Sequence, residues 1–270
     1  MKFTNIFVVY DPTRDDQVAL DRAALIAPEA SAKVHVFACI HGDIEKTEDK
    51  AKAISSRLAA QREQLDRAVA PLLEQGIAAT TEVEWDRDWY HAVVRASIRS
   101  HADVVFKSSY KHSSSQRVLN RTSDWTLIRE CLCPVLLVKK ETVQDVRKVL
   151  AAIDIREEKA NYGKLNERII NFTRRVMDSQ SAEVHFINAH RDLASFPDRN
   201  ALIKGCGVDS DRIHIKLGKP EDVIVENARG LDVSLVVVGN SARSGLSALV
   251  NGNTVEKVVD KVECDILALP

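Results

Sequence analysis

The fold of this chain is decided by its segment 234–270, Ser234-Leu-Val-Val-Val-Gly-Asn-Ser-Ala-Arg-Ser-Gly-Leu-Ser-Ala-Leu-Val-Asn-Gly-Asn-Thr-Val-Glu-Lys-Val-Val-Asp-Lys-Val-Glu-Cys-Asp-Ile-Leu-Ala-Leu-Pro270. The unbroken apolar run from Leu235 to Val238 predicts a parallel strand that is buried on both faces. Gly239 ends this strand, and Gly252 opens a helix that leads to a last apolar strand. Because backbone N–H groups at a helix start lack partners, a phosphate can bind there.

The same pattern occurs twice along the chain. Four apolar strands of the first half recur in order in the second: Asn5 to Asp11 in Lys148 to Asp154, Ala32 to Phe37 in Ala182 to Ile187, Ala102 to Lys107 in Ser234 to Gly239, and Cys133 to Val138 in Cys264 to Leu269. A repeat of this length has the size of a domain. We therefore expect two domains, residues 1–141 and 146–270. Strands that alternate with helices predict an α/β fold with a doubly wound parallel sheet in each.

The two halves differ in the connection after their second strand. In the first half we expect strands at 5–10, 33–38 and 79–83 and from Val104 and Val135, with helices at 17–27, 48–74 and 89–100 and from Ser123. Between Asn188 and Arg212 the second half is much shorter, so its second helix is expected to shrink to about 199–204. Either a helix has been reduced in this protein, or residues are missing from this chain.

The glycine loop resembles the signature of the universal stress protein family, G-x2-G-x9-G-[ST]. Gly239 and Gly252 occupy the first and third glycine positions, Ala242 stands at the second, and Asn253 and Thr254 follow. The likeness extends over the chain, including 5–20 and 122–125, and it is greatest to tandem-domain members. It implies two Rossmann-like sheets of five strands, of the adenine nucleotide alpha hydrolase type, in the order 3-2-1-4-5. It also implies a cytoplasmic stress-response protein that supports resistance to DNA-damaging agents.

The resemblance also implies a site for ATP or a related nucleotide in the second domain. In nucleotide-binding members, an aspartate after the first strand contacts base and ribose, and the glycine loop holds the phosphates. The corresponding residues here are Asp154, Gly239, Ser241, Ala242, Arg243, Gly252, Asn253 and Thr254. Each has a structural interpretation as well: an aspartate caps a turn, glycines form tight turns, and an arginine is solvated. The methyl group of Ala242 weakens the phosphate interpretation.

The first domain has lost its loop glycines. Lys107, Tyr110 and Asn120 stand in their places, and we expect their side chains to fill the space. Asp11 is retained, but it precedes Pro12 and further polar residues, which is also a strong turn signal. The cluster Lys107, Lys111, His112 and Ser113 to Ser115 would attract an anion, or it forms a solvated loop.

Histidine, aromatic and cysteine side chains often serve in functional sites, but for those of this chain we favour a structural interpretation. His35 and His185 recur at the centre of the second strand of each half, where a packed, hydrogen-bonded histidine is expected. Trp85, Trp89 and Tyr90 are expected to pack in the core, with a pocket or an interface as alternatives. Five cysteines, an odd number, do not form a disulfide framework, and Cys131-Leu-Cys133 has no second pair at metal-ligand spacing.

Composition and motifs limit the function. The 38 Lys+Arg and 39 Asp+Glu residues leave no basic excess for nucleic acid. No apolar run is long enough to span a membrane and no signal peptide is evident, which predicts a cytoplasmic protein. Hydrolase, zincin and P-loop motifs are absent from the sequence, so at most slow ATP hydrolysis is expected and no catalytic residue is assigned.

Two hypotheses about function remain open. In the first, the chain is a stress-response module whose second domain binds a nucleotide or another small phosphate-bearing ligand. In the second, it is a ligand-independent interaction scaffold with both sites degenerate. The last strands, at Val135 to Val138 and Ile266 to Leu269, are sheet edges, where we expect a homodimer or packing of the two domains about a pseudo-twofold axis.

Overall fold

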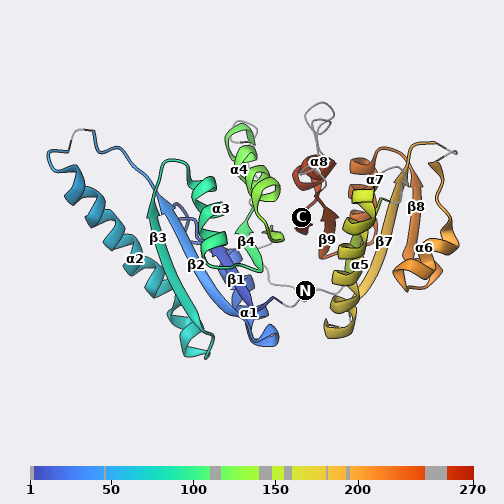
Figure 1. Ribbon diagram of the computed structural model, residues 1–270, viewed down its shortest axis with the longest axis horizontal. Coiled ribbons are helices and arrows are strands. Elements are labelled where there is room, and N and C mark those ends of the chain that lie inside the picture. The colour runs from blue at the N-terminus through green and yellow to red at the C-terminus, as the bar shows by residue number, and fades with distance from the viewer. Residues whose placement is uncertain are drawn as a thin grey trace. The chain divides into compact units, whose positions relative to one another are not determined.

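The computed structural model describes residues 3–45, 47–109, 117–139, 148–154, 160–180, 182–192, 195–240 and 254–270. The chain divides into two compact units, Lys2–Glu141 and Thr142–Pro270. In both units strands alternate with helices along the chain (Figure 1). Among the described helices, none combines the length and the apolar character that crossing a bilayer requires.

The first unit contains a parallel sheet of five strands. The strands are β1 (Asn5–Val9), β2 (Lys33–Ile40), β3 (Ala79–Trp85), β4 (Val104–Ser108) and β5 (Val135–Val138). The helices are α1 (Val18–Ala30), α2 (Lys50–Glu74), α3 (Trp89–Arg99) and α4 (Arg117–Glu130). The order in the sheet is β3-β2-β1-β4-β5, and every neighbouring pair is parallel. Right-handed crossovers place α1 and α2 on one face and α3 and α4 on the other.

The second unit repeats this topology. Its strands are β6 (Lys148–Ala152), β7 (Glu183–His190), β8 (Ile213–Leu217), β9 (Leu235–Gly239) and β10 (Asp265–Leu269). Its helices are α5 (Ala160–Gln180), α6 (Arg199–Cys206), α7 (Pro220–Gly230) and α8 (Thr254–Lys261), with a 3-10 turn at Ser210–Arg212. The strand order is β8-β7-β6-β9-β10. The predicted pair of doubly wound sheets with the order 3-2-1-4-5 is therefore confirmed.

The core of each unit is the sheet itself, covered on both faces. All five residues of β1 and all five of β10 are buried, which explains their unbroken apolar sequences. In the first unit Phe7 and Phe37 are fully buried, and their ring centroids lie 5.6 Å apart. Strands such as β1 and β10 therefore carry polar residues only at their ends, whereas the edge strand β3 carries Thr80, Glu82 and Glu84 along its length.

Two elements differ from the sequence-based expectation. Helix α4 begins at Arg117, several residues before the expected start at Ser123. Its first turns carry Arg117, Asn120 and Arg121, a polar stretch without the apolar period by which an amphipathic helix is recognised. Helix α1 continues to Ala30, past the expected end at Ala27, and contains Pro28 in its last turn. The shortened helix expected in the second unit is present: α6 has 8 residues where its counterpart α2 has 25.

We expect Asp103→Ala to lower the free energy of unfolding of the first unit by about 1–3 kcal/mol. The Asp103 carboxylate accepts hydrogen bonds from Thr4 N at 2.8 Å, Thr4 Oγ1 at 2.7 Å and Asn5 N at 3.0 Å, and so fixes the start of β1 beside β4. Urea denaturation measures the change. The control Asp178→Ala, at an exposed position of α5, should change stability little. Equal losses in both variants would contradict the assigned role.

Candidate functional site

The candidate site lies at the carboxyl edge of the second sheet, between β6 and β9. These strands are parallel neighbours, with Val149 opposite Leu235 and Ala151 opposite Val237. Asp154 follows β6 closely and Gly239 is the last residue of β9. From β6 the sheet continues to β7 on one side and to β9 on the other, so this edge is a topological switch point, where doubly wound folds bind ligands.

Two amide side chains fix the backbone at Asp154. Asn166 of α5 accepts a hydrogen bond from Asp154 N at 3.1 Å and donates one to Asp154 O at 2.7 Å. The buried Asn188 of β7 donates to Ile153 O at 3.0 Å. Asp154 is therefore held in a defined place at the end of β6. Sequence analysis missed both asparagines, because each contacts Ile153 or Asp154 only through the fold.

Gly239 is required by packing against α5. A Cβ atom at this position would lie 2.4 Å from Leu165 Cδ2 and 2.5 Å from Leu165 Cγ. The Leu165 side chain of α5 therefore lies so close to the end of β9 that an added methyl group would force it to shift. Beyond it, Asn240 is buried and its backbone N–H donates to Leu269 O at 2.7 Å. This close approach is a structural reason for the first glycine of the loop, independent of any ligand.

The remaining predicted site residues divide into two sets. Thr254 is the first residue of α8. Helix α8 is tied to α7 by two ion pairs, Lys257 with Glu221 at 2.8 Å and Lys261 with Asp222 at 2.6 Å. The other predicted residues lie outside the described part of the chain: Ser241, Ala242, Arg243, Gly252 and Asn253.

The corresponding edge of the first unit is closed by its own charges. Lys107 Nζ lies 2.7 Å from Asp124 Oδ1, and the two side chains are only 15% and 12% exposed. The Lys107 ammonium group also donates to Ser108 O at 2.8 Å and lies 5.7 Å from the centroid of the Trp89 ring. Ser109 Oγ donates to the other carboxylate oxygen of Asp124 at 2.8 Å.

This network bears on the anion site that the sequence suggested in the first unit. The charge of Lys107 is neutralised by Asp124, so Lys107 does not offer the free ammonium group that the hypothesis needed. Lys111, His112, Ser113 to Ser115 and Tyr110 lie outside the described residues, and the side chain of Asn120 is not described.

Asp11 takes the turn role that its sequence context indicated. Its Oδ1 accepts hydrogen bonds from Thr13 N at 2.9 Å and Thr13 Oγ1 at 2.6 Å. Gln17, just before α1, accepts from Asp11 N at 3.0 Å and donates to Asp11 O at 2.8 Å. In both units an amide side chain therefore clamps the backbone of the aspartate that follows the first strand.

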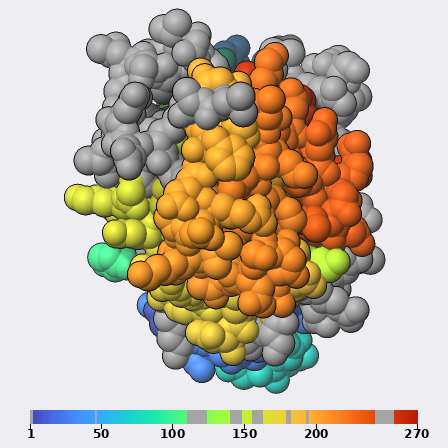
Figure 2. Space-filling view, turned by 90° about the vertical axis from the view of Figure 1, so that its right-hand side faces the viewer, coloured from blue at the N-terminus to red at the C-terminus, as the bar shows by residue number. Residues whose placement is uncertain are grey.

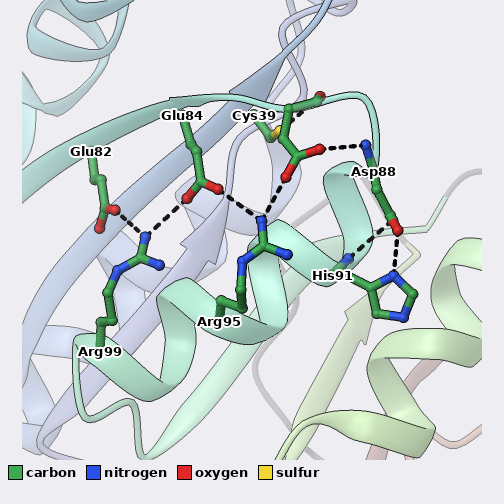
Figure 3. Close-up of polar contacts among 8 residues, drawn as sticks. Cys39, Glu82, Glu84, Asp88, His91, Arg95 and Arg99 are labelled. Carbon is green, nitrogen blue, oxygen red and sulfur yellow. Dashed lines mark hydrogen bonds and ion pairs between the residues drawn. The ribbon is translucent and has the colours of Figure 1, made fainter.

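A second polar cluster lies between β3 and α3 (Figure 3). Arg99 reaches Glu82 and Glu84, and Arg95 lies 2.8 Å from Glu84 and 2.6 Å from Asp86, so the charges alternate in a ladder. Each of these pairs is partly exposed, and such pairs contribute little individually to stability. The ladder thus joins α3 to the sheet edge, and both of its guanidinium groups are paired with carboxylates.

His91 and Cys39, which lie near this ladder, also have interactions that stabilise the fold rather than mark a reactive site. His91 bridges Asp88 and Glu130, the latter at 3.2 Å, and the hydrogen bond to Asp88 raises the pKa of His91. Burial raises the pKa of the Cys39 thiol to about 11, which disfavours the reactive thiolate. Within the described ranges, no three His, Cys, Asp or Glu side chains gather to form a metal site.

The aromatic residues of this region are not core residues as expected. Trp85, Trp89 and Tyr90 are all partly exposed. The Trp85 ring lies beside His41, at 5.6 Å between centroids, with the Arg57 guanidinium 5.7 Å away. Trp85 is the last residue of β3 and Trp89 and Tyr90 are the first two of α3, so all three lie at the ends of these elements rather than in the middle of the sheet.

Two tandem doubly wound α/β units, one with an aspartate and a glycine at its switch-point edge and one with an ion pair there, define a Rossmann-like protein with a duplicated domain. The model of the universal stress protein family matches residues 2–139 and 170–270. The chain belongs to the universal stress protein family, as its resemblance indicated.

Relatives match almost the whole chain. Universal stress protein E of Salmonella typhi is 29% identical over 300 aligned residues, which cover 99% of this chain and 94% of that protein. A functionally unknown protein from Pseudomonas aeruginosa PAO1 is 26% identical, with a TM-score of 0.74 over 99% of this chain and 92% of its own. A universal stress protein from Archaeoglobus fulgidus has a TM-score of 0.77 at 16% identity, over 98% of this chain and 95% of its own, and shares the fold.

The alignment with the Salmonella protein has 300 positions against 270 residues in this chain. The relative therefore has at least 30 residues that this chain lacks. Among the connections between strands of the second unit, the one from β7 to β8, which contains α6, is shortened most when each is compared with its counterpart in the first unit.

We expect Gly239→Ala to destabilise the second unit by about 1–3 kcal/mol, because the new methyl group overlaps Leu165. Leu165→Ala in the same chain should restore part of this loss by making room. Thermal and urea denaturation measure both variants. In the control Gly163→Ala, where nothing lies within 4 Å of the added methyl, stability should rise by about 0.5–1 kcal/mol. If the stability losses of Gly239→Ala and Leu165→Ala simply add in the double variant, the contact between the added methyl group and Leu165 is contradicted.

We expect Lys107→Met to lower the stability of the first unit by about 3 kcal/mol, because it leaves the buried Asp124 carboxylate without its cation. Replacing both partners, Lys107→Met with Asp124→Leu, should recover most of this loss. Urea denaturation of the four members of this cycle gives the coupling. Lys33→Met, at an exposed position, is the control. A loss in the double variant equal to the sum of the two single losses would show that the pair is not coupled.

Proposed function

We propose that this protein is a stress-response binding module whose second unit takes ATP, or a related nucleotide or small phosphate-bearing ligand, at the edge between β6 and β9. The observation that carries the proposal is the placement of Asp154. Asn166 and Asn188 fix its backbone and that of Ile153 at the switch point, beside the glycine end of β9. A segment whose backbone is fixed before a ligand arrives loses less freedom on binding.

The proposed contacts follow the family pattern. Asp154 would contact the base and ribose region, and Gly239, Ser241, Ala242, Arg243, Gly252, Asn253 and Thr254 would surround the phosphates. Helix α8 begins at Thr254, and a helix start favours anions through its unpaired N–H groups and its dipole. The ion pairs from α8 to α7 support this placement, because they hold the helix in position.

The first unit is proposed to bind no nucleotide. Lys107 and Asp124 occupy the edge that corresponds to the proposed site, and Asp11 caps a turn with Thr13. A ligand would have to break a largely buried ion pair, which is costly. One nucleotide per chain is therefore expected.

The wider biological role belongs to the same proposal. We infer a cytoplasmic protein that supports resistance to DNA-damaging agents and forms homodimers through its last strands. The chain is proposed to bind rather than to catalyse, because no group of three or more His, Cys, Asp or Glu side chains that could hold a metal ion occurs among the described residues. Slow ATP hydrolysis is the one activity that the site would permit.

One observation favours an alternative, a ligand-independent interaction scaffold. Leu165 packs directly against Gly239, so this glycine has a role without any ligand. Together with the closed edge of the first unit, this contact would leave both units as structural domains whose surfaces bind other proteins.

Calorimetric titration with ATP and Mg²⁺ tests the proposal. We expect saturation at one site per chain. Asp154→Asn should weaken binding by about tenfold to a hundredfold, the value of a hydrogen bond to a charged group. The matched variant Asp11→Asn, at the corresponding position of the first unit, should leave binding unchanged. Native mass spectrometry of freshly purified protein should show the same stoichiometry.

The variant Ala242→Gly separates the two candidate functions. Tighter binding by this variant than by the natural chain would show that the alanine tunes a working site. Binding by the variant alone would mean that the natural site is disabled and would favour the interaction scaffold. If neither protein binds, or if Asp11→Asn and Asp154→Asn weaken binding equally, the proposed site is wrong.

A further inference from the structure

Two histidines face each other across the outermost strand pair of the second unit. His185 lies in β7 with its side chain 7% exposed, and its Nε2 lies 2.7 Å from Glu183 Oε1. Its Nδ1 lies 3.1 Å from Nε2 of His214 in β8. The ring centroids are 5.2 Å apart. Among the described residues of this unit, β8 pairs with β7 alone. Figure 2 shows the side of the molecule that carries these segments, coloured orange.

The short nitrogen–nitrogen distance limits how many protons the pair can carry. When both rings are neutral, His214 donates its Nε2 proton to Nδ1 of His185, and His185 donates its Nε2 proton to Glu183. When the pair carries one added proton, the charged ring can still donate to an unprotonated nitrogen of the other ring, so the hydrogen bond between them is kept. A second proton leaves N–H facing N–H at 3.1 Å, where no hydrogen bond is possible and two like charges repel.

The charges around the pair oppose this second proton. His214 is approached by Lys216 of its own strand, by Arg199 of α6 and by Asp211 of the turn before β8, and Glu183 by Lys148 of β6 and by Arg212. Asp211 and Glu183 are outnumbered by these four cations. Burial, and then the neighbouring His185, lower the pKa of His214, while the hydrogen bond from His185 lowers the pKa of Glu183.

We propose that the His185–His214 pair makes β8 an acid-labile edge: a second proton on the pair separates the rings and releases β8, with the packed helix α6, from β7. Helix α6 packs on β8, so the two move together. Release leaves the outer edge of β7 without a partner.

The equivalent histidine of the first unit faces a hydroxyl group instead of a second histidine. His35, which occupies the same position in β2, has Nε2 3.1 Å from Glu82 Oε2, but its Nδ1 lies 2.8 Å from Thr80 Oγ1. A hydroxyl group both donates and accepts, so it can turn to suit either charge state of the histidine. Protonation of His35 therefore breaks no contact, and β3 stays paired with β2 in acid.

The direction of the pH effect follows from linkage. The pKa of His214 is lower in the folded unit than its ordinary value of 6.5. The unfolded or released state therefore binds a proton more readily, and stability is present above that value and lost as the pH falls through the folded pKa. Loss of β8 should begin below about pH 6.5, before carboxylates titrate.

Hydrogen–deuterium exchange of the full chain at pH 7.5 and 5.5, corrected for the intrinsic pH dependence of exchange, tests the proposal. Protection of the segment that contains α6 and β8 should fall by about tenfold in acid, while β3 keeps its protection. In His214→Thr, which gives His185 the hydroxyl partner that His35 has, the fall should disappear. The control His101→Asn, at an exposed left-handed position, should behave as the natural chain does.

A second measurement does not depend on any variant folding. Imidazole chemical shifts of His185 and His214 in labelled protein should show that the pair takes up a single proton while β8 remains paired, and a second only as β8 protection is lost. Uptake of two protons with β8 still protected would overturn the proposal. Equal acid loss in β3 and β8, no loss in either, or an unchanged loss in His214→Thr would overturn it as well.

Discussion

The rest of each unit depends on one constraint, the burial of a parallel sheet on both faces. Strands such as β1 and β10 are buried along their whole length, so their side chains are apolar and polar chemistry is confined to their ends. The backbone that leaves each strand end still needs hydrogen-bond partners. Gln17 supplies them after β1, Asn166 and Asn188 supply them after β6, and Asp103 supplies them at the start of β1. Asn166 and Asn188 thereby fix the edge at which a ligand would bind.

The duplicated units have used the same edge in different ways. In the first, Lys107 and Asp124 form an ion pair where the loop glycines of the family would stand. In the second, Gly239 remains, and Leu165 of α5 comes close to its backbone. A side chain that replaces a glycine can neutralise and fill a site permanently, whereas a retained glycine leaves the backbone accessible to helix and ligand alike. This difference supports a single binding unit per chain.

The repeated histidines show the same divergence at the sheet margins. His35 and His185 keep equivalent strands and a glutamate partner, yet one faces a hydroxyl and the other a second imidazole. A hydroxyl adapts to either protonation state, while two imidazoles share only one proton between them. One residue on a neighbouring strand therefore decides whether a packed histidine is indifferent or sensitive to acid.

The sequence by itself determined the strands and the duplication, because a buried parallel strand requires an unbroken apolar run and a repeat of domain length requires a second core. The strand order was implied by the family resemblance. The sequence also located Asp154 and Gly239 at one edge. It failed at the polar start of α4. Only the tertiary structure decided that Leu165 covers Gly239, that Asp124 neutralises Lys107 and that His214 faces His185. These partners lie far apart in the chain, and no local pattern records a contact that the sheet topology alone creates.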